Sequence, residues 1–320
     1  MTRVSLRTPG RLHFGLLSWG GDAPRQFGGL GLMVDAPALA LSAEPSSNWS
    51  AEGPLADRVL VFASKVAEGL AGQGVVVEPA AFRVLEAPPG HVGLGSGTQL
   101  GLSVARLVCE LASRPHFCVL ELAALSGRGL RSGIGLHGFA HGGLIVDGGR
   151  SGPDGTPPLL ARLEFPEEWS VLIVLPGPGP GIHGPSEIRA FAQLPPSPEA
   201  LTDRLCRLVL LGLMPATIER DLDRFGEALE EIQRRVGEGF APAQGGAFAR
   251  PGLDVVVAEM RAQGLRGVGQ SSWGPVLYGF SEGSPAERAA LLARLERRLV
   301  LPPGAAIWTR ASRRGATLGG

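Results

Sequence analysis

A glycine-rich segment between two regularly patterned stretches constrains the fold of this chain more than any other feature. Residues 82–86 are typical of a short strand, and residues 100–112 carry apolar side chains at helical spacing. The loop between them, Gly93-Leu-Gly-Ser-Gly-Thr, allows tight turns. A strand, a glycine loop and a helix in this order present backbone N–H groups and the positive helix end to an anion. A plain turn before a helix is the alternative.

The loop predicts a phosphate-binding site. The residues predicted to form it are Gly93, Gly95, Ser96, Gly97 and Thr98. Backbone N–H groups at the glycines would bind phosphate oxygens, and the two hydroxyl groups would add donors and a helix cap. The segment is not a Walker A loop, because the chain has no Gly-Lys-Ser or Gly-Lys-Thr sequence.

Composition excludes several classes of protein. The 320 residues are 44% hydrophobic and 19% charged, which is typical of a compact globular chain and not of disorder. Thirty basic and thirty acidic residues cancel, so we expect neither nucleic acid nor an anionic membrane surface as a partner. No apolar run reaches membrane-spanning length, and the three cysteines form no C-x-x-C pair. We therefore expect a cytoplasmic protein.

The pattern changes along the chain. Strand patterns dominate the first half and helical patterns the second, which predicts an α+β fold. We place the two domains at residues 1–165 and 166–320. Further expected elements are a strand at 75–78, helices at 57–70, 120–130 and 285–299, and a helix break at Leu213-Met-Pro. The amphipathic run 201–213 suits either a core or a dimer surface, so a homodimer is kept open.

Three segments resemble the ordered motifs of the GHMP kinase superfamily. The central segment, residues 88–99, is similar to the P-x-x-x-G-L-G-S-S motif of that superfamily. Residues 9–16, Pro-Gly-Arg-Leu-His-Phe-Gly-Leu, look like the N-terminal motif, and residues 267–275 look like the C-terminal glycine-rich one. The resemblance implies an N-terminal domain like ribosomal protein S5, a C-terminal ferredoxin-like domain, and a substrate cleft between them.

Two longer strings resemble one branch of that superfamily, the β-ribofuranosylaminobenzene 5′-phosphate synthases. They are residues 127–149 and 268–275. The resemblance implies a transferase that condenses phosphoribosyl pyrophosphate with 4-aminobenzoate or 4-hydroxybenzoate. Carbon dioxide and pyrophosphate would be released, with Mg²⁺ as cofactor, in the biosynthesis of a tetrahydromethanopterin-type cofactor. The sequence does not choose between the two aromatic acids and does not identify the Mg²⁺ ligands.

A small-molecule kinase that uses ATP is the main alternative. Kinases of the superfamily usually carry S-G-x-D, whose aspartate helps to deprotonate the attacking hydroxyl. This chain has Ser132-Gly-Ile-Gly, so Gly135 stands at the position of that carboxylate. The transferase needs no such base, because carbon dioxide leaves the ring carbon in place of a proton. A binding protein without catalytic activity is a third alternative.

The resemblance also indicates individual site residues. The predicted catalytic residues are Arg25, Asp22, Arg131 and Ser132, and the predicted second cleft loop contains Gly269, Ser271 and Ser272. Arg25 matches a family arginine and would clamp a phosphate or carboxylate group, with a solvated loop arginine as the alternative. Other members carry aspartate where this chain has Ser18, and Asp22 is close enough in sequence to replace it.

The histidines and the large aromatic residues give weaker indications of a site. The histidines at positions 13, 91, 137, 141 and 183 form no H-E-x-x-H or cysteine-flanked pattern, although His137 and His141 are four residues apart. Because most isolated histidines are structural, we predict no transition-metal site. Trp19, Trp273 and Tyr278 could pack against the benzoate ring, but aromatic residues beside glycine turns also serve as core.

Overall fold

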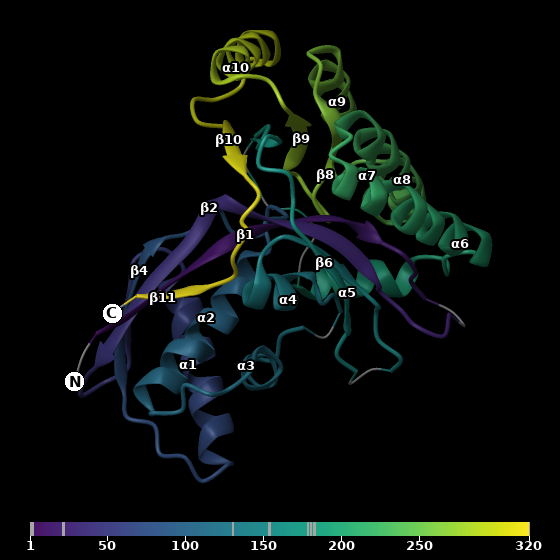
Figure 1. The fold of residues 1–320 in the computed structure, drawn as a ribbon. Coiled ribbons are helices and arrows are strands. Elements are labelled where there is room, and N and C mark those ends of the chain that lie inside the picture. Colours follow the sequence, from purple (N-terminus) through teal and green to yellow (C-terminus); the bar gives the residue numbers. More distant parts are fainter. Residues whose placement is uncertain are drawn as a thin grey trace.

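The computed structural model describes residues 3–20, 23–129, 131–152, 155–177, 179, 181 and 184–319. Within them the strands form a seven-stranded sheet and a four-stranded sheet. Figure 1 shows the helices α1, α2 and α3 below the larger sheet and α10 at the opposite end of the molecule. The chain therefore has two layered halves, and the predicted α+β class is confirmed.

Two long antiparallel strands organise the larger sheet. They are β1 (Val4–Leu16) and β2 (Gly29–Pro45). The first part of β2 pairs with β5 (Leu144–Asp147), which pairs with β6 (Leu159–Leu163), and its second part pairs with β4 (Ala80–Glu86). The short strand β3 (Ser50–Glu52) lies parallel to β4. The sheet thus divides along β2, which pairs with β1 on one side and with β5 and β4 in succession on the other.

Helices with apolar faces cover this sheet. They are α1 (Ala56–Ala71), α2 (Ser96–Leu111), α3 (Val119–Ser126) and α4 (Ile134–His141). Val59, Val66 and Leu70 lie at helical spacing on α1 and are fully buried. The helix α2 is buried along most of its length and packs on β1 and β2. Because α2 begins at Ser96, the glycine loop is held where the sheet, α1 and α2 meet.

The smaller sheet has the strand order of a ferredoxin-like fold. Its strands are β7 (Ser170–Val174), β8 (Arg266–Gln270), β9 (Leu277–Ser281) and β10 (Ala306–Arg310). Their spatial order is β10-β7-β9-β8, which is fourth, first, third, second, and every pair is antiparallel. The helix α10 (Pro285–Leu299) connects β9 to β10. The expected C-terminal domain is confirmed.

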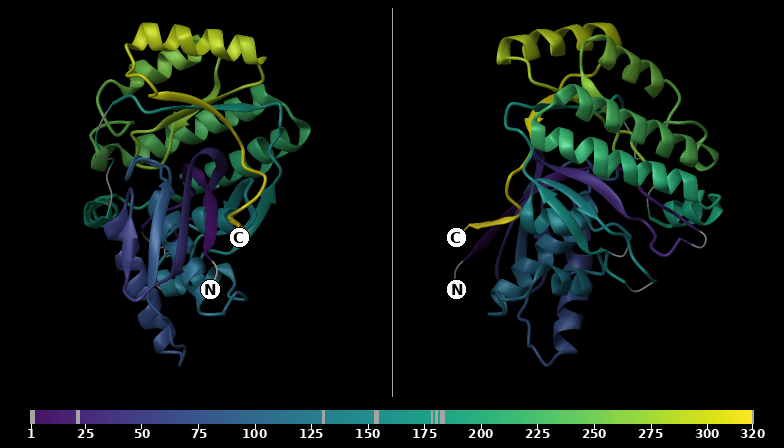
Figure 2. Two further views of the ribbon diagram at one scale, coloured as in Figure 1. Left: turned by 90° about the vertical axis from the view of Figure 1, so that its left-hand side faces the viewer. Right: turned by 45° about the vertical axis from the view of Figure 1, so that its right-hand side comes forward.

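A helical layer follows β7 and covers the smaller sheet. It contains α5 (Gly184–Gln193), α6 (Glu199–Leu208), the π-helical turn η1 (Val209–Leu213), α7 (Met214–Glu219), α8 (Leu222–Gln244) and α9 (Leu253–Ala262). Figure 2 shows these helices lying across the long strands of the first half. None of the described helices is long and apolar enough to cross a membrane.

Several expected elements differ from the structure. The predicted break at Leu213-Met-Pro is wrong, because Leu213 and Met214 keep helical backbone angles and the π-helical turn η1 lies directly before Pro215. The helix ends at Arg220 instead, and Asp221 caps α8 by accepting the Arg224 N–H at 3.0 Å. Residues 75–78 are not a strand, α3 stops at Gly127 in a left-handed conformation, and α4 was not predicted.

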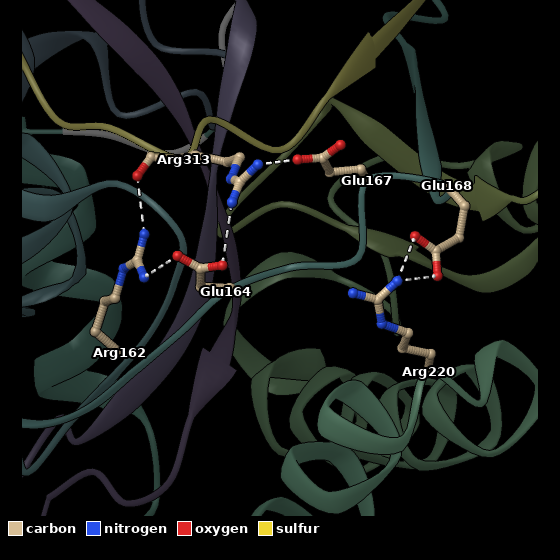
Figure 3. Close-up of polar contacts among 6 residues, drawn as sticks. All are labelled: Arg162, Glu164, Glu167, Glu168, Arg220 and Arg313. Carbon is tan, nitrogen blue, oxygen red and sulfur yellow. Dashed lines mark hydrogen bonds and ion pairs between the residues drawn. The ribbon is translucent and has the colours of Figure 1, made fainter.

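The chain passes between the halves at two places. Residues 164–169 lead from β6 to β7, and a second segment leads from β10 to β11 (Thr317–Gly319), which pairs with β1. Figure 3 shows Arg313 of the second segment between Glu164 and Glu167 of the first. Glu168 binds Arg220 at 3.1 Å. These side chains are about half exposed, so the ion pairs align the crossing segments and add little stability. The domain boundary at 165/166 stays a prediction.

An aromatic cluster fills the core beside the first crossing. Phe165 and Trp169 flank Glu167 and Glu168 of the linker, and both rings pack against Phe225 of α8, with centroids 5.4 and 5.1 Å from that of Phe225. Phe280 of β9 lies 5.2 Å from Phe225 on another side. Phe225 is fully buried, so the cluster joins the linker, the helical layer and the smaller sheet.

We expect Phe225→Ala to lower the free energy of unfolding by about 3–5 kcal/mol, because it leaves a cavity among these rings. Arg313→Ala is the matched surface control and should cost about 1 kcal/mol or less. Urea unfolding of both variants measures the difference. A loss below about 1 kcal/mol for Phe225→Ala would show that this cluster does not stabilise the packing of the linker, the helical layer and the smaller sheet.

Candidate functional site

A cavity of about 470 Å³ lies between the two halves of the chain. The larger sheet and its helices supply β1, α1, the glycine loop and the segment between α3 and α4. The second half supplies α5, α8 and the loop between β8 and β9. Both halves are therefore needed to form its walls, as expected for a cleft between two domains.

The predicted glycine loop forms one end of the cavity. All five predicted residues line it: Gly93, Gly95, Ser96, Gly97 and Thr98. Gly93 and Gly95 have φ of +100° and +70°, which side chains other than glycine rarely adopt. Because α2 begins at Ser96, the positive end of this sixteen-residue helix faces the cavity.

Arginine side chains surround this loop. A Cβ atom on Gly97 would lie 2.9 Å from Nη2 of Arg58 and 3.0 Å from Nη2 of Arg128. A Cβ atom on Gly95 would lie 2.9 Å from Nε of Arg11. The missing side chains of the loop thus make room for three guanidinium groups that come from β1, α1 and the segment after α3.

These three guanidinium groups and that of Arg131 have N–H donors that are buried without a partner among the described residues. They are Nε and Nη1 of Arg11, Nη1 of Arg58, Nε of Arg128 and Nη1 of Arg131. Burial lowers the pKa of Arg11 to about 10, with the charge of Arg131 acting in the same direction and Glu187 opposing it. Burial also lowers the pKa of Arg128, assisted by the positive charges of Arg58 and Arg131. Such a cluster is suited to bind a multiply charged anion.

Glu187 is the carboxylate that lines the described part of the cavity. Its Oε2 accepts a hydrogen bond from Nη2 of Arg131 at 2.8 Å. One carboxylate cannot neutralise four arginines, so the positive charge at this end stays in excess. Arg131 also lies over the ring of Phe191, 5.8 Å from its centroid, so it contacts the part of the wall that the second half of the chain supplies.

A buried hydrogen-bond chain lies next to the arginines. Gly15 N–H donates to Nδ1 of His13 at 3.2 Å, so the neutral ring carries its proton on Nε2 and donates to Ser132 Oγ at 3.2 Å. Ser132 Oγ in turn donates to Asp147 Oδ2 at 3.3 Å. Burial lowers the pKa of His13 and raises the pKa of Asp147 to about 6, against the hydrogen bonds that Asp147 accepts.

The predicted residue Ser132 lines the cavity, but its hydroxyl group is already hydrogen-bonded to other residues of the protein. Besides these two contacts, Ser132 Oγ accepts the Ile134 N–H at 3.3 Å, and this fills its bonding capacity. Gly133 N–H binds Asp147 Oδ2 at 2.9 Å and Gly149 N–H binds Oδ1 at 2.9 Å. These hydrogen bonds hold the segment that carries Arg128 and Arg131 against the sheet.

Aromatic rings form the other end of the cavity. Phe240 of α8 and Trp273 of the β8–β9 loop are stacked, with centroids 4.6 Å apart and planes 13° apart. Phe191 of α5 meets Trp273 edge-on at 5.2 Å, and Phe27 meets Phe191 at 5.4 Å. All four rings line the cavity. Trp19 lies behind Phe240 at 5.0 Å, and Tyr278 is buried in the core against Phe14.

The second glycine-rich loop fastens the two halves together. Ser271 is fully buried; its Oγ donates to the Gly93 carbonyl at 2.6 Å and accepts the His13 N–H at 3.0 Å. Ser272 lines the cavity, and its N–H donates to the His13 carbonyl at 3.1 Å. Gly269 lies beside Gln233, whose side chain a Cβ atom would strike at 2.6 Å.

One predicted catalytic residue lies away from the cavity, and another is not among the described residues. Arg25 does not line the cavity: its Nε donates to the Gly148 carbonyl at 2.6 Å and its Nη2 to the Gly149 carbonyl at 2.8 Å. Asp22 lies outside the described residues. Ser18 Oγ donates to the Arg25 carbonyl at 2.7 Å, which closes the turn.

The described residues contain no group of three or more histidine, cysteine, aspartate or glutamate side chains that could hold a metal ion. His13 and His91 line the cavity, and His137 is buried against the Pro157 carbonyl at 2.8 Å. His141 is exposed on the surface, and His183 lies outside the described residues. A donor set of oxygen atoms suits Mg²⁺, which often binds through one or two carboxylates and substrate phosphates. Glu187 is a carboxylate of this kind in the cavity, with its Oε2 bonded to Arg131.

Sequence reasoning missed several residues that the structure brings together. Arg11 stands inside the first motif, and Arg128 lies three residues before Arg131, so both had a signal in their neighbourhood. Arg58, Phe191 and Phe240 are single residues on amphipathic helices, and no local pattern distinguishes them from ordinary surface or core residues.

Comparisons with known proteins agree with this arrangement. The family model for the C-terminal domain of GHMP kinases matches residues 213–297. Among solved structures, a homoserine kinase from Cytophaga hutchinsonii superposes with a TM-score of 0.70 at 15% identity, covering 100% of this chain and 98% of that one. At such low identity the likeness shows the fold, and the expected GHMP kinase fold is confirmed.

Relatives at higher identity define the family. A β-ribofuranosylphenol 5′-phosphate synthase from Methanothermobacter thermautotrophicus is 34% identical and covers 97% of each chain. The protein of that name from Archaeoglobus fulgidus is 33% identical and covers 88% of each chain. The resemblance inferred from the motifs is thereby confirmed. The chain belongs to the β-ribofuranosylphenol 5′-phosphate synthase family of enzymes, on the fold of the GHMP kinases.

Proposed function

We propose that this enzyme is a transferase that condenses phosphoribosyl pyrophosphate with a 4-substituted benzoate and releases carbon dioxide and pyrophosphate. One observation carries the proposal: the cavity combines unpartnered buried arginine donors at one end with a wall of stacked aromatic rings at the other. A substrate pair with one polyanion and one aromatic ring matches both ends.

The arginine end would bind the phosphate groups. Arg58 and Arg128 converge on Gly97, next to the amino end of α2, and would bind pyrophosphate oxygens together with the backbone N–H groups of the loop. Arg11 lies on the Gly95 side of the same loop and would bind a further anionic group of the substrate. Arg131 borders both ends, so it is placed to contact either the ribosyl phosphate or the benzoate carboxylate.

The chemistry follows from this division. The bond between C1′ of the ribose and pyrophosphate breaks, and pyrophosphate leaves with the electron pair. The ring carbon that bears the carboxylate attacks C1′, and the bond to the carboxylate then breaks and returns its electrons to the ring as carbon dioxide leaves. Positive charge fixed around the pyrophosphate stabilises the transition state without reorganisation.

Mg²⁺ is part of the proposal. It would offset charge on the departing pyrophosphate, and Glu187 is the described carboxylate that could hold it. The protein's own side chains would do the rest: the arginines would orient the phosphates, and Phe240 and Trp273 would hold the benzoate ring and exclude water.

A kinase function fits the site less well. Gly135 lines the cavity at the start of α4, and a Cβ atom there would lie 3.2 Å from Thr98 Cγ2. No carboxylate can act from that residue on a substrate hydroxyl. The names of the relatives contain a phenol, the ring that remains when 4-hydroxybenzoate loses carbon dioxide, so we favour 4-hydroxybenzoate over 4-aminobenzoate as the substrate.

The cellular setting is also proposed. A role in making a tetrahydromethanopterin-type cofactor, in the cytoplasm, follows from the family resemblance. A homodimer is supported by exposed apolar side chains around η1 and α7: Leu210, Leu211 and Ile218 are each more than three-fifths exposed.

We expect the purified protein with Mg²⁺ and phosphoribosyl pyrophosphate to release one carbon dioxide and one pyrophosphate per 4-hydroxybenzoate consumed. Carboxyl-labelled acid and a coupled pyrophosphate assay measure the two products, and reactions with 4-aminobenzoate or without phosphoribosyl pyrophosphate are the comparisons. ADP formation from ATP and a small alcohol, with no pyrophosphate from either acid, would overturn the proposal.

Arg58→Ala and Arg128→Ala should each lower kcat/KM for phosphoribosyl pyrophosphate about 30-fold, equivalent to about 2 kcal/mol, because each removes a charge-assisted contact. Arg234→Ala is the control, since Arg234 pairs with Glu238 on the exposed face of α8. Arg25→Gln, measured in the same series, shows whether Arg25 takes part. Wild-type kinetics for both cavity variants would remove the arginines from the site.

Gly97→Val should abolish binding of phosphoribosyl pyrophosphate in calorimetry, because its side chain would occupy the space of two guanidinium groups. The fold should survive, since the atoms it strikes are the ends of flexible side chains. Circular dichroism checks the fold, and Gly72→Val is a control for a glycine outside the cavity, because Gly72 is exposed at the end of α1 with φ of −61° and a Cβ atom there would meet nothing closer than 3.5 Å. Retained affinity in a folded Gly97→Val protein would mean that the loop is an ordinary turn.

A further inference from the structure

Three glutamine side chains line the cavity, and two of them are part of its fixed wall. Gln233 Oε1 accepts the Gln270 N–H at 2.8 Å, and its Nε2 donates to the Phe14 carbonyl. Gln270 Oε1 accepts the Ala249 N–H at 2.8 Å, and its Nε2 donates to the Ser272 carbonyl at 3.0 Å. Both ends of both amides are therefore occupied by the main chain.

Gln244 differs from these two. Its Nε2 donates to the Ala247 carbonyl at 3.1 Å, but its Oε1 is buried without a hydrogen-bond partner among the described residues. The contact with Ala247 fixes the orientation of the amide, because the opposite assignment would set two carbonyl oxygens against each other. A buried amide oxygen without a donor is unfavourable, so a donor group of a ligand would stabilise this wall.

The position of Gln244 indicates which ligand group that is. Gln244 is the last residue of α8 and lies one helical turn after Phe240, on the same face of the helix. Phe240 is stacked on Trp273 in the aromatic wall. Gln244 therefore borders the part of the cavity that suits a planar ring, whereas the arginine donors come from β1, α1 and the segment between α3 and α4.

We propose that Gln244 Oε1 accepts a hydrogen bond from the substituent opposite the carboxylate on the aromatic substrate. The inference rests on the proposed function and adds a residue that determines specificity to it. The hydroxyl of 4-hydroxybenzoate and the amine of 4-aminobenzoate are both donors, so Gln244 selects either acid over rings that lack a donor at this position. The selection works because an acid without the donor leaves the buried oxygen unpaired.

Calorimetry with 4-hydroxybenzoate and 4-fluorobenzoate tests this contact directly, since the two acids are of similar size and fluorine offers no hydrogen to donate. The wild-type protein should bind the hydroxyl acid about tenfold more tightly, the factor expected for one hydrogen bond. In Gln244→Met, which keeps the length of the side chain, the two affinities should agree within about twofold. Gln244→Leu carries the same expectation and replaces the first variant if that one does not fold.

Equal binding of the two acids by the wild-type protein would overturn the inference, and so would a tenfold preference that persists in the variants. Release of carbon dioxide by the wild-type protein, measured in parallel, separates this result from the proposed function. If carbon dioxide is released and the preference does not depend on Gln244, the transferase stands and the role of Gln244 falls. If the wild-type protein neither binds the acids nor releases carbon dioxide, both fall.

Discussion

The excess positive charge around the glycine loop is the constraint on which the rest of the site depends. Arg11, Arg58 and Arg128 come from three separate elements, and their buried donors find no partners among the described residues. Repulsion between such groups is tolerable when an anion binds among them. Glycine at positions 95 and 97 is required because any side chain there would displace a guanidinium group. The loop, the arginines and the ligand are thus parts of one arrangement.

The contact between the two halves places the aromatic wall opposite this charge. Ser271, from the second glycine-rich loop, binds the Gly93 carbonyl and the His13 N–H, so it joins the smaller sheet directly to the glycine loop. Trp273 follows two residues later and stacks on Phe240. The same loop carries Ser271, which bonds to the glycine loop, and Trp273, which belongs to the aromatic wall. The fold therefore fixes the distance between the cationic and aromatic ends of the cavity.

Much of the fold could be predicted from the sequence, and less of the site. Three motifs in order indicated the superfamily, and helical spacing placed α1 and α10 within a residue or two. The prediction at Leu213-Met-Pro was wrong because a π-helical turn directly before Pro215 keeps the helix continuous, and residues 75–78 have strand composition without a partner strand. Arg58, Phe191 and Phe240 could not be found in advance, since their meeting depends on tertiary packing. Arg25 matched a family position, but its guanidinium contacts two carbonyls of the main chain.

The central claim is that the arginine end holds the phosphates and the aromatic end receives the ring. A crystal structure of the protein with phosphoribosyl pyrophosphate alone tests it most directly. The account predicts pyrophosphate oxygens within hydrogen-bond distance of Arg58, Arg128 and the backbone of residues 95–97, with C1′ directed toward Phe240 and Trp273. Phosphates bound elsewhere, with the arginine donors still unpartnered, would contradict it.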